Sequence, residues 1–219
     1  MEQKPRPVKR RTYDATARRA QSAGTRQRIV DTARALLLER GYRATTVAAV
    51  ARGARVSVDT VYELVGRKPT LLREVIEQAI SGTDRAVAAD ERDYVKAMQA
   101  EADPARKLDL YAAAMRAIHA RMAPLALALR DASTTEPEAL EVWQEISNRR
   151  AENMRRLARN LRDADGLRDE LSIEEAGDIL WATNSPELYV LLVHERNWTP
   201  QRYQTWLADT WARLLMPDG

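Results

Sequence analysis

The sequence predicts an all-α protein with two domains, on three observations. Apolar side chains recur every three to four residues along most of the chain, which is the period of an amphipathic helix. After Thr70 the sequence shows neither the alternation of period two that indicates a half-buried strand nor a regular internal repeat. Charge divides the chain. Residues 1–69 hold 16 Lys and Arg against 6 Asp and Glu, a net of +10, which leaves −7 for residues 70–219 in a chain of net charge +3.

Composition excludes several classes of site. The chain has 219 residues and no cysteine, so disulfides, thiolate nucleophiles and cysteine-bound zinc or iron–sulfur centres are ruled out. Its two histidines, His119 and His194, lack metal-motif spacing, and no nucleophile motif or phosphate-binding glycine loop occurs, so we expect no cofactor and no metal. No apolar run approaches about 20 residues, and the basic N-terminus lacks the apolar core of a signal peptide. We therefore expect a cytoplasmic protein without membrane contact.

Residues 1–22 are basic and poor in large apolar groups, and Pro5 and Pro7 interrupt any early helix. This composition predicts a disordered or partly ordered arm. Two interpretations stay open: a solvated tail, or an arm that follows phosphates or enters a minor groove beside the main contact. The cations for the second interpretation are Lys4, Arg6, Lys9, Arg10 and Arg11.

Three helices are predicted in the basic region that follows. The first begins near Thr25 and ends at Gly41, a residue that readily takes the left-handed capping conformation. Thr46 and Ser57 supply capping hydroxyls before two short helices, the second of which runs to about Val65. Two short helices joined by a brief turn in a basic domain are typical of a helix-turn-helix, whose second helix enters the major groove of DNA.

The stretch from Thr25 to Leu72 carries five short motifs. They are Arg40-Gly41-Tyr42, Thr45-Thr46, Val56-Ser57, Thr60-Val61-Tyr62 and Gly66-Arg67-Lys68. Together they closely resemble the DNA-binding domain of the TetR (tetracycline repressor) family of transcriptional regulators. The resemblance implies a three-helix helix-turn-helix DNA-binding domain over residues 23–69 and a helical ligand-binding and dimerisation domain over residues 70–219.

One turn residue departs from the family. Arg55 stands where the family usually has glycine, in the turn between the two short helices. Either Arg55 accepts a left-handed backbone at some cost, or the turn closes in a slightly different way.

The resemblance implies which residues hold the DNA backbone. Tyr62, Thr60 and Lys68 are expected at phosphates, because hydroxyls and an ammonium donate well to phosphate oxygens. Thr46, at the start of the second helix, is either a further backbone contact or only a cap.

Base recognition is expected at the start of the third helix. Ser57, Val58 and Asp59 are expected to face base edges there, with Val58 against a thymine methyl group. The alternative role for Asp59 is to stabilise the helix N-terminus by its charge. Val61 and Leu64 are expected in the core.

The acidic region begins with a connecting helix from about Thr70 to Ile80, followed by an irregular charged segment around Gly82. Asp103-Pro104 then opens a long helical stretch that Pro124 and Pro137 divide.

Two further helical stretches are predicted at the end of the chain, over about Ser172–Arg196 and Pro200–Met216. Pro186 should bend the first of them or break one hydrogen bond, with Ser185 or Asn184 satisfying the freed carbonyl.

The family resemblance also implies a ligand cavity among the central helices and a homodimer in which the final helices of two chains form a four-helix bundle. The candidate cavity-lining residues are Tyr111, Met115, His119, Leu125, Leu129, Trp143, Met154, Trp181, Asn184 and Tyr189. The candidate dimer-interface residues are Leu188, Leu192, Tyr203, Trp206, Thr210 and Leu214.

These features predict a sequence-specific regulator whose partners are a double-stranded DNA operator, a small-molecule effector and a second copy of the chain. The family suggests a repressor released from a palindromic operator by its ligand. The first alternative is a non-sensing DNA-binding or architectural dimer, which a filled, cavity-free core would favour. The second is an enzyme acting on a small apolar molecule, for which the sequence lacks converging catalytic groups.

Overall fold

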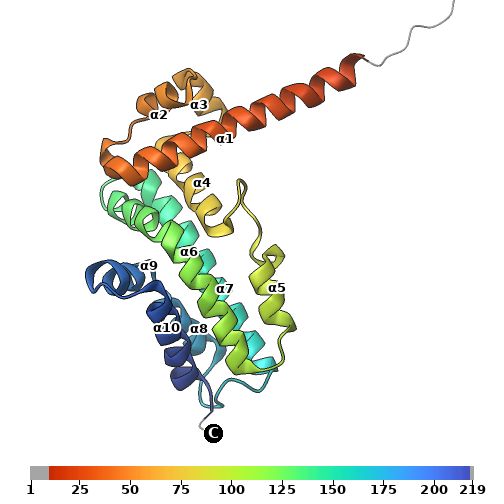
Figure 1. Ribbon diagram of the computed structural model, residues 1–219, viewed down its shortest axis with the longest axis vertical. Helices are drawn as coiled ribbons and strands as arrows, with labels where there is room; N and C mark the ends of the chain where they lie inside the picture. The colour runs from red at the N-terminus through yellow and green to blue at the C-terminus, as the bar shows by residue number, and fades with distance from the viewer. Residues whose placement is uncertain (1–9, 218–219) are drawn as a thin grey trace, which may run out of the picture. The chain divides into compact units, whose positions relative to one another are not determined.

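The computed structural model describes residues 10–217, and every regular element in that range is helical, as the sequence predicted (Figure 1). The chain divides into two compact units after Leu71, close to the boundary expected at residue 69. The first unit contains α1 (Arg10–Ala44), α2 (Val47–Ala54) and α3 (Val58–Leu64), and α4 (Lys68–Ser81) crosses the division. No helix in the described range is long and apolar enough to cross a membrane.

Helix α1 begins at Arg10, so the predicted start near Thr25 is wrong, and residues 10–22 of the expected disordered or partly ordered arm are helical. This segment is rich in Ala and Arg, which favour helix, and the prolines that argued against helix lie before it. Lys4, Arg6 and Lys9 lie outside the described residues. The expected end at Gly41 is a real interruption, because Gly41 has φ 75° and ψ 175°, and one further turn carries the helix to Ala44.

The short helices α2 and α3 are capped as predicted. Thr46 Oγ1 accepts from the Ala49 N–H at 3.1 Å, and Ser57 Oγ accepts from the Thr60 N–H at 3.1 Å. Val61 is fully buried, whereas Leu64, also expected in the core, is partly exposed. Helices this short have little intrinsic stability, so the caps and packing against α1 hold them.

The turn between α2 and α3 resolves the question raised by Arg55. Arg55 has φ 57° and ψ 47°, a left-handed conformation, and its N–H donates to Arg52 O at 3.2 Å. The Val56 N–H donates to Ala51 O at 3.0 Å. Of the two possibilities raised for this turn, Arg55 therefore takes the left-handed backbone, which its Cβ makes sterically unfavourable.

The second unit is a bundle of helices on either side of α6 and α7 (Figure 1). Its elements are η1 (Ala89–Glu91), α5 (Asp93–Ala100), α6 (Pro104–Ser133), α7 (Pro137–Asp163), α8 (Ile173–Thr183), α9 (Pro186–Tyr189), η2 (Val190–Glu195) and α10 (Pro200–Leu215). Helix α6 packs against α5, α7 and α10, and α7 packs against α8. The segment after Gly82, expected to be irregular throughout, contains η1 and α5.

Pro124 does not divide the long helical stretch as expected. Helix α6 continues through it from Pro104 to Ser133, although proline removes one backbone donor. Met122, Ala123 and Leu125 are buried on either side of the exposed Pro124. Burial of these neighbours stabilises the helix across the missing hydrogen bond. Of the two prolines expected to divide the stretch, only Pro137 starts a new helix.

Pro186 has a stronger effect than the predicted bend. Helix α8 ends at Thr183, and α9 begins at Pro186, where a missing N–H costs nothing. Ser185 Oγ accepts from the Leu188 N–H at 3.2 Å and so caps α9. The carbonyl oxygen of Asn184, which thereby loses the Leu188 N–H, accepts instead from Arg150 Nη1 on α7 at 2.6 Å.

We expect Arg55→Gly to raise the free energy of unfolding by about 1 kcal/mol, because glycine takes the left-handed conformation without a Cβ clash. Arg52→Gly is the matched control: Arg52 is exposed and helical in α2, so glycine there should lower stability by about 1 kcal/mol. Chemical denaturation of both variants measures the two values. A loss of stability in Arg55→Gly as large as in the control would contradict strain at this turn.

Candidate nucleic-acid interface and candidate ligand cavity

The exposed face of α3 carries the residues expected to meet DNA. Val58 is 37% exposed and Tyr62 is 49% exposed, and Ser57 and Asp59 are also exposed. Val58 and Tyr62 are four residues apart and therefore share one face of α3. This face therefore offers an apolar contact and a phenol hydroxyl to a binding partner.

Several of the predicted contact groups also have structural roles. The hydroxyls of Ser57 and Thr60 lie 2.8 Å apart, in addition to the cap that Ser57 forms. Lys68 Nζ lies 3.8 Å from the centroid of the Tyr42 ring, and Tyr42 is buried. The ring holds the ammonium at the start of α4 by a cation–π interaction, so the side chain is positioned before any partner binds.

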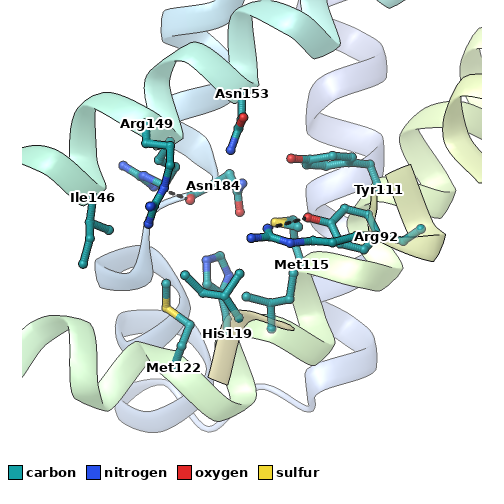
Figure 2. A pocket seen from close by; sticks show the side chains of 13 residues that line it. Arg92, Tyr111, Met115, His119, Met122, Ile146, Arg149, Asn153 and Asn184 are labelled. Carbon is teal, nitrogen blue, oxygen red and sulfur yellow. Dashed lines mark hydrogen bonds between the residues drawn. The ribbon is translucent and has the colours of Figure 1, made fainter. Parts of the chain in front are cut away.

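The second unit contains a small, partly open cavity of about 60 Å³ (Figure 2). Its lining residues are Ile80, Arg92, Tyr94, Tyr111, Met115, Ile118, His119, Met122, Ile146, Arg149, Arg150, Asn153 and Asn184. Four of the predicted lining residues are among them: Tyr111, Met115, His119 and Asn184.

The other predicted lining residues do not border this cavity. They are Leu125, Leu129, Trp143, Met154, Trp181 and Tyr189. Leu125, Leu129, Met154 and Tyr189 are buried in helix packing instead, because their positions on α6, α7 and α9 face neighbouring helices. Large and aromatic side chains were expected to line the cavity, but side chains of these types also fill the core.

The sequence did not lead us to predict the part of the cavity lining that comes from α7. Ile146, Arg149, Arg150 and Asn153 follow a spacing of three to four residues and so share one face of the helix. Arginines at positions that continue an apolar stripe were the available signal, because a charged residue on a buried face needs a specific partner.

Arg150 is the most constrained of these arginines. Its guanidinium lies 4.5 Å from the ring centroid of Trp181, and its Nη1 donates to Asn184 O. Burial lowers the pKa of Arg150 to about 10, although Glu187 acts in the opposite direction. The side chain therefore stays charged at neutral pH in a largely desolvated position.

The two other arginines have different partners. Arg149 Nη2 forms an ion pair with Glu77. Arg92 donates through Nε to Val87 O at 3.1 Å and through Nη1 to the hydroxyl of Tyr94 at 3.4 Å. Figure 2 shows Arg92 and Arg149 reaching toward the cavity from opposite sides, with Asn153 and His119 between them.

His119 is held as a neutral ring. It is 2% exposed, its Nδ1 lies 3.2 Å from the hydroxyl of Tyr203, and its ring centroid lies 5.5 Å from that of Tyr189. Burial, together with the charge of Arg150, lowers the pKa of His119 to about 3. The imidazole is therefore a hydrogen-bonding wall residue of the cavity at neutral pH.

Tyr203 was expected in the dimer interface, and its side chain is fully buried within the single chain. The hydrogen bond to His119 and the packing on Tyr189 explain why: a phenol is buried where its hydroxyl finds a partner. Leu188, Leu192, Trp206 and Thr210 are partly exposed and Leu214 is 43% exposed, so these five retain surface.

The amide of Asn184 has one unsatisfied end. The residue is 1% exposed, and its Oδ1 has no hydrogen-bond partner among the described residues, while Nδ2 lies 3.7 Å from Met154 Sδ. A buried polar atom without a partner is costly, and rotation of the amide would present either end to a ligand.

Comparison with known families bears on the first unit. Residues 29–75 match the family model described as bacterial regulatory proteins of the tetR family. This match makes residues 29–75 similar to the DNA-binding domain of the TetR family. No curated protein sequence matches this one.

Solved structures share the fold of nearly the whole chain. FadR of Bacillus subtilis, solved in complex with stearoyl-CoA, has a TM-score of 0.67 and 17% identity, covering 84% of this chain and 96% of its own. A candidate transcriptional regulator from Saccharomonospora viridis, solved with choline, has a TM-score of 0.66 and 18% identity, with 88% and 98% covered. The ketosteroid transcriptional regulator KstR2 of Mycobacterium tuberculosis has a TM-score of 0.55 and 17% identity, with 88% and 95% covered.

The neutral state of His119 predicts a pH dependence of stability. Its pKa is about 3 in the folded chain against an ordinary value of 6.5, so the unfolded chain binds the proton first as pH falls below 6.5. Stability is complete above that pH and should fall by about 2 kcal/mol between pH 7.5 and pH 5. Chemical denaturation at several pH values measures this loss.

Two variants separate His119 from other groups. His119→Asn should abolish most of the loss over this pH range, whereas His194→Asn should keep it, because His194 is exposed. An equal pH dependence in His119→Asn and the unmodified chain would show that another group is responsible.

Proposed function

We propose that this protein is a ligand-responsive transcriptional repressor of the TetR family that binds a palindromic operator as a homodimer. The observation that carries the proposal is the pairing of an exposed α3 face in a basic helix-turn-helix unit with a partly open cavity in the second unit. A ligand that binds the DNA-free arrangement more tightly than the DNA-bound one shifts the population away from the operator.

The residues proposed to hold the DNA backbone are Tyr62, Thr60, Lys68 and Thr46. The exposure of Tyr62 and the fixed position of the Lys68 ammonium support this role. Base reading is assigned to Val58 with Ser57 and Asp59. Val58 is the strongest of the three, because its exposed methyl groups have no structural role in the helix cap.

The cavity favours a sensing protein over the architectural alternative, because a purely architectural dimer has no need of a hollow lined by polar groups. The structural relatives solved with stearoyl-CoA and with choline hold ligands of very different chemistry. We therefore propose a small-molecule effector for this chain without transferring either ligand.

Homodimerisation is proposed through the last helices. Leu214 on α10 and Leu191 on η2 are each 43% exposed, and Leu188, Leu192 and Trp206 keep part of their surface. Exposed apolar side chains on neighbouring elements are typical of a protein–protein interface. A two-fold interface would present two copies of α3 to the two halves of a palindrome.

Selection from a random DNA pool, followed by binding at several salt concentrations, tests the DNA-binding proposal. We expect a palindromic site, and Tyr62→Phe should weaken binding to every sequence roughly tenfold by removing one phosphate hydrogen bond. Val58→Ser should instead change the preferred base pair at one position of each half-site.

Asp178→Asn is the control for these variants, because Asp178 is exposed on α8 in the second unit and should leave affinity and preference unchanged. Weak, sequence-blind binding with steep salt dependence would favour the architectural dimer.

Leu214→Asp should shift the protein from dimer to monomer, since a carboxylate in the centre of an apolar interface loses its hydration. Leu38→Asp is the matched control, because Leu38 is similarly exposed, at 51%, but lies on α1 in the first unit and not on the last helices. Analytical ultracentrifugation measures the oligomeric state, and circular dichroism checks folding. A dimer that persists in folded Leu214→Asp rejects this interface.

A further inference from the structure

The charge balance of the cavity is one-sided. Three arginines line it, Arg92, Arg149 and Arg150, and none of the described residues that line it is Asp or Glu. Of the three, only Arg149 has an ion pair at the cavity, with Glu77. The hydrogen bonds of Arg92 and Arg150 go to neutral oxygens.

Glu187, the carboxylate that acts on the pKa of Arg150, forms its ion pair with another arginine. Glu187 Oε1 accepts from Arg130 Nη1 at 2.5 Å and is not part of the cavity lining. Burial still depresses the pKa of Arg150 more than Glu187 raises it, which agrees with a guanidinium short of compensating charge. A desolvated guanidinium in this state binds an oxyanion strongly, through charge-assisted and often bidentate hydrogen bonds.

The rest of the wall is apolar. Met115, Ile118 and Met122 come from α6, and Ile80 and Ile146 come from α4 and α7. Figure 2 shows Met122 and Ile146 on the side of the cavity away from Arg92. Methionine side chains adapt to irregular apolar shapes, so this wall fits a hydrocarbon or aromatic body.

We propose that the cavity binds an organic anion, whose carboxylate or other oxyanion head pairs with Arg92 and Arg150 and whose apolar body packs on Met115, Met122 and Ile146. Asn184 can donate to the same head group through Nδ2, once its amide is rotated so that Nδ2 replaces the unsatisfied Oδ1. The inference rests on the proposed function in one respect, that this cavity is the sensing site. It excludes cationic ligands, because like charge at the arginines repels them.

Matched probes that differ only in the head group test the charge preference. Phenylbutyrate, phenylbutyramide and phenylbutylamine form one such set, and octanoate, octanamide and octylamine form another. Isothermal titration calorimetry on the full-length protein without DNA gives the affinities. We expect at least one carboxylate to bind tenfold or more tightly than its amide, and neither amine to bind more tightly than its amide.

Variants place the binding at the arginines. Arg92→Gln and Arg150→Gln should each reduce the carboxylate preference tenfold or more, and Arg150→Lys should keep part of it. Arg106→Gln should leave it unchanged, because Arg106 is exposed at the start of α6 and does not line the cavity. Arg92 is the safer test if loss of Arg150 impairs folding, since Arg92 lies at the edge of the bundle before α5.

The same probes separate this inference from the proposed function. A carboxylate that binds with the expected preference but does not release operator DNA supports the anion site and rejects ligand-responsive repression through it. Equal binding of carboxylate and amide, tightest binding of an amine, or no carboxylate binding in either set overturns the anion site, whatever the protein does on DNA.

Discussion

The hydrogen bond from Arg150 Nη1 to the carbonyl oxygen of Asn184 joins the middle of α7 to the break between α8 and α9. The break exists because Pro186 starts a new helix and Ser185 Oγ takes the Leu188 N–H that would otherwise reach Asn184 O. A carbonyl left open in this way must find a donor, and a guanidinium is a strong one. The same contact fixes a charged group at the wall of the cavity.

Three polar or aromatic side chains near this cavity pack together in their uncharged forms. His119, Tyr203 and Tyr189 come from α6, α10 and α9, and their rings pack at centroid distances of 5.0 to 6.0 Å. Burial raises the pKa of both tyrosines and lowers that of His119, so all three favour the uncharged form. A neutral, hydrogen-bonded floor leaves the arginines as the charged groups of the cavity, which gives the site its preference for anions.

The helix-turn-helix unit depends on local contacts instead. Its short helices are defined by local contacts: the hydroxyls of Thr46 and Ser57 at their starts and the left-handed Arg55 between them. Because these contacts satisfy the helix ends, the outward face of α3 is free of structural duty at Val58 and Tyr62. Recognition of DNA can then vary with those side chains while the helix-turn-helix is preserved.

The sequence alone determined the all-α class, the capped helix-turn-helix and the position of most helices, because period, caps and turns depend on residues only a few positions apart. Only the tertiary structure decided where side chains far apart in the sequence meet. In the folded protein α6 continues through Pro124, and a new helix begins at Pro186. Tyr203 is buried, and Arg92 and Arg150 line one cavity. Burial and pairing of this kind depend on packing between helices, and the pattern within a single helix does not encode them.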